Sequence, residues 1–363
     1  MIARVGWSST EHKTEIAAKR KISYPRGIMC LNCSNRFRFA RIGLALALRG
    51  LALGLTAATL SGPKPALAAE EKTPAGEKAR FPCNEAEAKR YTAHRISQPI
   101  HVDGRLDEPC WQKVPRSARF VDILTGQPTL HDTRTAVLWD DENLYVAFWV
   151  EEPDVQATFT EYGSPIYSNN DVEVFIAGKD AYYEFEINAL NTIYEVFFIW
   201  EEAYEKGGFA QVHEFKRTTP KVTGFNGVGF TTHPRGKRIG SWAWRFPGIK
   251  TAVHIDGTLN NSKDKDRGWT VELAFPWKGM EWLAKADHRS LPPKTGDVWR
   301  IDFSRFNQYK APAPAKDSGG WFLSPHGVWD SHIPECFPYV TFSTNDVNTV
   351  QETIFTDPPS ARR

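Results

Sequence analysis

The sequence predicts an all-β protein, an antiparallel β-sandwich of jelly-roll-like form with one short helix and long loop insertions. About ten short segments alternate polar and apolar residues or are rich in β-branched and aromatic side chains. Glycine, proline, Asp and Asn separate them, and no strand is followed by the long helical pattern that a parallel sheet requires. An ordered region of roughly 250 residues is a usual size for one all-β domain.

Three strand patterns between residues 168 and 198 are central to this prediction. Asp171–Ala177, Tyr182–Asn188 and Thr192–Phe198 are rich in β-branched and aromatic residues, and the first two alternate with a period of two. Turn residues connect them, so we expect an antiparallel meander. One face is apolar, whereas the other carries carboxylates, amides and tyrosines and would suit a polar ligand.

The other elements are shorter or less regular. Leu144–Val150 is apolar on both faces, as expected of a central strand, and Pro276 begins a helix that runs to Ala286. Residues 106–111 read as one helical turn that buries Leu106 and Trp111, and 201–250 is a poorly patterned insertion. Further strands are expected at 100–102, 119–124, 134–140, 251–256, 268–275, 297–306 and 337–342.

The first 68 residues resemble a secretory leader. Arg36, Arg38 and Arg41 precede an apolar run at 42–60, and a small-x-small cleavage site ends at Ala68. We therefore expect export to the periplasm or the exterior, with no membrane association after cleavage. The alternative is an uncleaved anchor, although Arg49 interrupts the apolar run.

The expected organisation is a leader at 1–68, a linker at 69–95, the sandwich at 96–345 and a polar tail at 346–363. Both Met1 and Met29 remain candidate starts.

The charge after the leader excludes one class of partner. Removing residues 1–68 leaves 34 Lys and Arg against 41 Asp and Glu, a net charge of −7. Nucleic-acid binding would need a basic surface, so it is not expected.

Three cysteines follow the leader: Cys83, Cys110 and Cys336. An exported protein with three cysteines allows one disulfide and one spare thiol. Cys110 and Cys336 lie in the first and last ordered segments, which slightly favours their pairing. Free thiols remain the alternative.

The ordered segments together resemble family 9 carbohydrate-binding modules. The resemblance spans residues 96–343 and rests on five segments in order: 100–111 (IHVDGRLDEPCW), 137–146 (VLWDDENLYV), 171–175 (DVEVF), 268–272 (GWTVE) and 329–342 (WDSHIPECFPYVTF).

The resemblance implies a sandwich that holds a sugar ring between two aromatic side chains, at positions held here by Tyr167 and Trp329. It also implies hydrogen bonds from Glu173 and Asn188. Glu186 stands where a basic residue would be expected, and we include it among the sugar-binding candidates. Aromatic rings suit the C–H face of a sugar, and carboxylates and amides suit its hydroxyls.

These residues lead to the expected function, which is non-catalytic binding of a polysaccharide or oligosaccharide in support of polysaccharide catabolism, with glycosidases as partners. Trp242 and Trp244 are candidates to extend the binding platform, whereas four other tryptophans on strong strand patterns are expected in the core: Trp139, Trp149, Trp269 and Trp299.

No cofactor is assigned from the residues, and the histidines show no H-x-x-x-H pair that would indicate zinc. The family resemblance implies structural calcium, for which the turn aspartates are candidates: Asp103, Asp107, Asp140, Asp141 and Asp154.

Two alternatives stay open. One is a haem-binding or electron-transfer sandwich, in which Met280 would be the only methionine after the leader. The other is a glycoside hydrolase acting on O-glycosyl bonds through a pair drawn from Glu173, Glu184, Glu186, Glu195 and Asp302.

Overall fold

The computed structural model describes residues 80–308 and 317–349, so the expected leader lies outside the described residues. The strands are β1 (Arg90–Arg95), β2 (Val121–Asp122), β3 (Thr133–Trp139), β4 (Asn143–Glu151), β5 (Asp171–Ala177), β6 (Ala181–Asn188), β7 (Ile193–Trp200), β8 (Val222–Phe225), β9 (Arg238–Ser241), β10 (Lys250–Asp256), β11 (Gly268–Pro276), β12 (Val298–Phe306), β13 (Gly320–Phe322) and β14 (Tyr339–Asp346).

Two short α-helices, α1 (Pro109–Lys113) and α2 (Glu281–Ala284), accompany these strands. The remaining helical turns are 3₁₀: η1 (Glu85–Glu87), η2 (Ile166–Ser168), η3 (Glu201–Ala203), η4 (Phe209–Gln211), η5 (His213–Phe215), η6 (Trp277–Met280), η7 (Pro334–Cys336) and η8 (Val347–Thr349). No helix in these ranges is long and apolar enough to cross a membrane.

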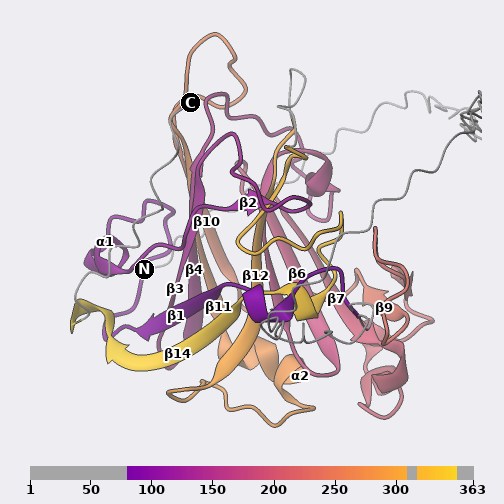
Figure 1. Cartoon of the computed structure of the whole chain (residues 1–363). Coiled ribbons are helices and arrows are strands. Elements are labelled where there is room, and N and C mark those ends of the chain that lie inside the picture. The colour runs from indigo at the N-terminus through magenta and orange to yellow at the C-terminus, as the bar shows by residue number, and fades with distance from the viewer. Residues whose placement is uncertain (1–79, 309–316, 350–363) are drawn as a thin grey trace, which may run out of the picture. The chain divides into compact units, whose positions relative to one another are not determined.

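One continuous hydrogen-bonded path connects most of the strands, in the order β10-β11-β4-β3-β1-β14-β12-β5-β6-β7-β9-β8. Neighbours pair antiparallel except where β1 pairs parallel with β14 and with β3. Figure 1 shows β1 and β14 side by side, joining the group β10, β11, β4 and β3 to the group that contains β12, β6 and β7.

The core lies between these two groups of strands. Phe148 of β4 contacts Phe303 of β12, and Phe185 of β6 contacts Phe275 of β11, with ring centroids 6.3 and 5.4 Å apart. These contacts make the fold a β-sandwich, as the sequence predicts. Trp139, Trp269 and Trp299 are buried as expected, and Trp149 is half-buried.

The central antiparallel meander is confirmed. β5 pairs antiparallel with β6, and β6 with β7. Gly178 in the first connection is required because a Cβ there would lie 2.3 Å from the backbone oxygen of Leu283. β4 is central, between β3 and β11, and the predicted helix after Pro276 is present as η6 and α2.

Some expected elements differ. Residues 100–102 form no strand, and the first strand is instead β1, within the segment expected to be a linker. The strand expected at 119–124 is reduced to the two residues of β2. β8, β9 and β13 lie in segments without a regular alternation, which is why the sequence pattern missed them.

The expected disulfide between Cys110 and Cys336 is wrong. Cys336 pairs with Cys83, and Cys110 is a free, half-buried thiol at the start of α1. The error follows from the assumption that residue 83 lies in a solvated linker, whereas residues 80–95 pack against the sandwich through β1 and this disulfide.

The insertion at 201–250 extends the sheet rather than forming a separate lobe. β9 pairs with β7, and β8 pairs with β9. The segment between these two strands then reaches the loop at 326–332, where Asp330 binds its backbone. The polar face of the meander is therefore covered.

Candidate functional site

A cavity of about 300 Å³ lies on the polar face of β5, β6 and β7. The meander supplies its floor, and the insertion and the loop after β13 supply its walls. The lining residues are Tyr167, Glu173, Glu184, Glu186, Tyr194, Phe198, Phe225, Val228, Trp242, Phe306, Trp329, Asp330, Ser331 and His332.

Two exposed aromatic rings stand at this cavity. Tyr167 in η2 is 47% exposed, and its ring meets Tyr194 edge-on at 5.5 Å. Trp329 is 38% exposed and meets Phe306 edge-on at 5.2 Å. Large aromatic rings are usually buried, so this exposure beside one cavity is what a stacking surface requires.

The position of the Trp329 indole depends on a glycine, which has no side chain. Gly320 of β13 lies beneath it, and a Cβ at that position would be 2.8 Å from the ring. The backbone of Trp329 lies close to Gly229, where a Cβ would be 2.5 Å from the carbonyl oxygen of Trp329. The two glycines let Trp329 lie close to β13 and to the insertion.

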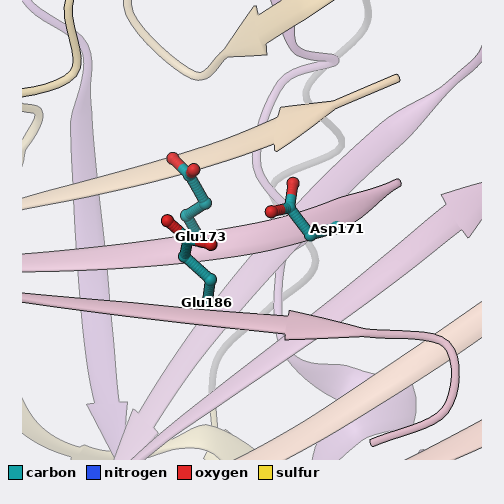
Figure 2. Close-up of side chains that lie close together, drawn as sticks. All are labelled: Asp171, Glu173 and Glu186. Atoms are coloured by element: carbon teal, nitrogen blue, oxygen red, sulfur yellow. The ribbon is translucent and has the colours of Figure 1, made fainter. Parts of the chain in front are cut away.

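Carboxylates form the floor because of the strand register. Glu173 of β5 pairs with Glu186 of β6, and Asp171 lies two residues before Glu173 on the same face. Figure 2 shows the side chains of Asp171, Glu173 and Glu186 close together on adjacent strands. Ser304 of β12 donates a hydrogen bond of 2.6 Å to Glu173 Oε2.

These carboxyl groups are buried and close to one another. Burial, and then the neighbouring carboxylates, raises the pKa of Glu173, Glu184 and Glu186 well above its usual range. Burial also raises the pKa of Asp171 to about 8. None of the described residues that line the cavity is Lys or Arg, although the buried Arg305 acts to lower the pKa of Asp171 and so offsets part of the negative charge.

Asp330 is the exception among the acids. Its Oδ2 accepts hydrogen bonds from the backbone N–H groups of Val228, Gly229 and Phe230, and its Oδ1 accepts one from His332 N. Burial acts to raise the pKa of Asp330, but the nearby His332 and these donors hold it below its ordinary value.

His332 closes one end of the cavity in its neutral form. Its Nδ1 lies 3.3 Å from the Tyr182 hydroxyl, and its Nε2 lies 3.7 Å from Glu184 Oε1. Burial lowers the pKa of His332 to about 3. Arg238, which is also buried, donates to the Tyr182 hydroxyl and to the His332 carbonyl, at 3.0 and 3.1 Å.

Of the five residues expected to bind sugar, the structure brings four to one cavity: Tyr167, Glu173, Glu186 and Trp329. Asn188 does not line it. Its Oδ1 accepts hydrogen bonds from the backbone of Leu190 and Thr192, both at 3.0 Å, and its Nδ2 donates to the Phe159 carbonyl. Asn188 therefore stabilises the turn between β6 and β7.

Of the two loop tryptophans, Trp242 lines the cavity and donates from Nε1 to the Tyr194 hydroxyl at 2.6 Å. Trp244 instead packs in the core against Phe197 and Tyr183.

Sequence reasoning missed several lining residues. Glu184 and Tyr194 could have been predicted from Glu186. Glu184 lies two residues before Glu186 on the same face of β6, and Tyr194 of β7 faces Glu186 across the strand pair. Phe225, Asp330 and His332 lie in loops or in a short strand without a regular pattern, so no local signal identifies them.

Among the five turn aspartates expected to hold calcium, Asp103, Asp140 and Asp141 have protein partners. Asp140 accepts hydrogen bonds from two backbone N–H groups and from the Tyr145 hydroxyl. Asp141 pairs with Arg95, and Asp103 accepts from the backbone of Arg105. Among the residues in the described ranges, the one group of acids whose oxygens converge is Asp171, Glu173 and Glu186.

Comparison with known proteins agrees with this architecture. Residues 102–225 match the family described as carbohydrate family 9 binding domain-like. No protein of curated function matches the chain in sequence.

Three solved structures are similar to this chain. One, from Bacteroides uniformis, is described as a candidate carbohydrate-binding protein; it is 14% identical, has a TM-score of 0.45, and the match covers 70% of this chain and 100% of that one. The others are of a family 9 carbohydrate-binding module from Caldicellulosiruptor kristjanssonii. Its complex with cellotriose is 14% identical, with a TM-score of 0.39 and coverage of 73% and 98%. Its complex with glucose is 13% identical, with a TM-score of 0.39 and coverage of 70% and 97%.

Proposed function

Because residues 102–225 match the carbohydrate family 9 binding domain-like family, we propose that the protein binds a saccharide in the cavity between Tyr167 and Trp329. The binding is non-catalytic and serves polysaccharide breakdown carried out by partner glycosidases. The observation that carries the proposal is that two exposed aromatic rings and a carboxylate floor meet at one cavity.

The chemistry of a pyranose matches these surfaces. Its C–H face packs on an aromatic ring, at about 1 kcal/mol beyond area burial by analogy with aromatic pairs. Its hydroxyls both donate and accept, so they satisfy carboxylates such as Glu173 and Glu186 whether or not these are ionised. Tyr194 and Trp242 supply further aromatic surface.

The size of the cavity limits the ligand. About 300 Å³ is at the lower end of the range for small-molecule sites. We therefore expect one or two sugar units, such as the end of an oligosaccharide chain, rather than the middle of a long polymer.

Binding is better supported than hydrolysis. A glycosidase needs one carboxyl group that stays protonated and one that stays ionised, in environments that push the two pKa values apart. Here the pKa values of Glu173, Glu184 and Glu186 all shift upwards. The ionised Asp330 is occupied by four backbone N–H groups, which leaves it unsuited to act as a nucleophile.

The haem alternative gains no support from Met280. This side chain is fully buried in the hydrophobic core rather than at the cavity.

Export is part of the proposal. The leader-like pattern at residues 1–68 and the disulfide between Cys83 and Cys336 both favour an oxidising compartment. N-terminal sequencing of protein recovered from the periplasm or the medium would test it, and a mature chain that begins at Ala69 is expected.

Affinity electrophoresis in gels that contain xylan, cellulose derivatives or mixed-linkage glucans tests the binding proposal, and a glycan array extends the test to other sugars. We expect retarded migration on at least one glycan, which Trp329→Ala abolishes. Val298→Ala is the matched control, because Val298 is an exposed apolar side chain that does not line the cavity. If wild type and Trp329→Ala migrate alike on every glycan, and the array shows no binding, the proposal is wrong.

A further inference from the structure

The carboxylate floor has a feature that sugar binding does not explain. One oxygen from each of Asp171, Glu173 and Glu186 lies within 4.8 Å of the others. Oxygen ligands lie about 2.3–2.6 Å from Ca²⁺, so two of them on one ion are at most about 5 Å apart. The three oxygens are thus close enough to bind one ion together.

Two of these side chains also have an oxygen without a donor. In the described part of the chain, no donor outside the group reaches Asp171 Oδ2 or Glu186 Oε2, and the two carboxyl groups hydrogen-bond each other only when one of them holds a proton. Both residues are almost fully buried, at 0% and 1% exposure. A buried carboxylate oxygen without a partner is costly, and the cost falls if a proton or a cation binds there.

Asp171, Glu173 and Glu186 differ from another buried acid of this protein in the number of their hydrogen-bond donors. Glu272, for comparison, is also buried, but its oxygens accept from Trp111 Nε1 and from the backbone of Asp103 and Gly104. Among the described residues, the three acids of this group have one donor each from outside it: Ser304 donates to Glu173, Phe306 N donates to Asp171 and Tyr167 N donates to Glu186.

We propose that Asp171, Glu173 and Glu186 bind one hard divalent cation at the floor of the cavity, Ca²⁺ in preference to Mg²⁺. Three carboxylates and no nitrogen or sulfur ligand match a hard cation. Ca²⁺ tolerates irregular geometry, whereas Mg²⁺ demands a near-ideal octahedron. Since Glu173 and Glu186 also line the cavity, the ion would carry water or a ligand hydroxyl on that side.

The test uses the metal alone, without sugar, so its outcome is independent of the proposed function. Purified full-length chain is stripped with EDTA and titrated with CaCl₂ and MgCl₂ by isothermal titration calorimetry. Tb³⁺ luminescence, sensitised by the tyrosines and tryptophans of the cavity, provides a second readout that Ca²⁺ should displace. We expect one saturable Ca²⁺ site and weaker binding of Mg²⁺.

Two substitutions locate the ion. Glu186→Gln is expected to weaken Ca²⁺ binding at least about tenfold, because it removes a ligand. Glu184→Gln removes the same charge from the same cavity outside the triad and should change the affinity less than about threefold. If Glu186→Gln fails to fold by circular dichroism, Glu173→Gln replaces it.

The proposal is overturned if wild type shows no saturable Ca²⁺ binding up to about 1 mM, the weak end of extracellular calcium sites. Protons alone would then occupy the triad. Equal weakening by Glu184→Gln and Glu186→Gln would also overturn it, because the cation would then be held by the diffuse charge of the cavity.

Discussion

Asp330 binds the backbone of Phe230, with Oδ2 accepting the Phe230 N–H at 2.8 Å across 100 positions of sequence. The same oxygen binds the N–H groups of Val228 and Gly229. This carboxylate fastens the insertion to the loop that carries Trp329, and so it joins two walls of the cavity.

Replacing Asp330 should therefore loosen the site and lower stability. Asp330→Ala leaves four backbone N–H groups without their acceptor, three of them part-buried and that of His332 buried, and we expect a loss of about 3 kcal/mol in the free energy of unfolding. Urea denaturation followed by fluorescence measures this. Glu201→Ala, which breaks an exposed ion pair with Arg217, is the control and should cost less than about 1 kcal/mol. Equal costs would show that the Asp330 contacts contribute little.

Gly320→Ala tests the position of the indole without altering any group at the ligand. The new Cβ would lie 2.8 Å from the ring of Trp329, so the ring must move. We expect saccharide affinity to fall about tenfold, with only a small loss of stability. Gly224→Ala on β8 is the matched control, because a Cβ there meets nothing within 4 Å. Unchanged affinity in Gly320→Ala would mean that the indole does not contact the sugar.

His332 should make the protein sensitive to acid. Its pKa is about 3 in the folded protein, because of burial, and about 6.5 in the unfolded chain. Between these values the unfolded chain binds a proton that the folded protein does not, so the free energy of unfolding falls as pH falls below about 6.5. The contribution is about 2 kcal/mol at pH 5.

Urea titrations of wild type and His332→Gln at pH 7.5 and pH 5 isolate this effect from the carboxyl groups. The stability difference between the two proteins should shift in favour of the variant at pH 5. A difference that stays constant with pH would contradict the prediction.

Reducing the disulfide should destabilise the sandwich. Cys83 and Cys336 are 253 residues apart, and a cross-link that closes so long a loop restricts the unfolded chain strongly. We expect dithiothreitol, or Cys83→Ser, to lower the free energy of unfolding by about 4 kcal/mol. Cys110→Ser should keep the response to dithiothreitol, since Cys110 is free. A cross-linked peptide containing Cys110 in mass spectrometry would refute this pairing.

Much of the fold was predictable because its strands alternate or are uniformly apolar. β4, β5, β6, β11 and β12 fall where the period of two or the apolar run places them. β8 and β9 were not predicted, because they are strands only through pairing with β7 and with each other, and no local sequence pattern indicates that pairing. β1 was not predicted, because it pairs parallel with β14, which comes from the opposite end of the domain in sequence.

By itself, the sequence determined which side chains share a face. Alternation puts Glu173 on the face of β5 opposite to that of Val172 and Val174, so the carboxylates of the meander lie together on the face that points away from the core. Tyr167 and Trp329 were selected by the family resemblance rather than by alternation.

Only the tertiary structure decided what surrounds that face. The insertion and the loop around Asp330 cover it, so carboxylates that would be ionised on an open sheet are buried beside one another, and Asp171 acquires a pKa of about 8. It also decided that Asn188 supports a turn and that Cys336 pairs with Cys83. The reason is physical: burial and pairing depend on residues distant in sequence, whereas alternation depends only on neighbours.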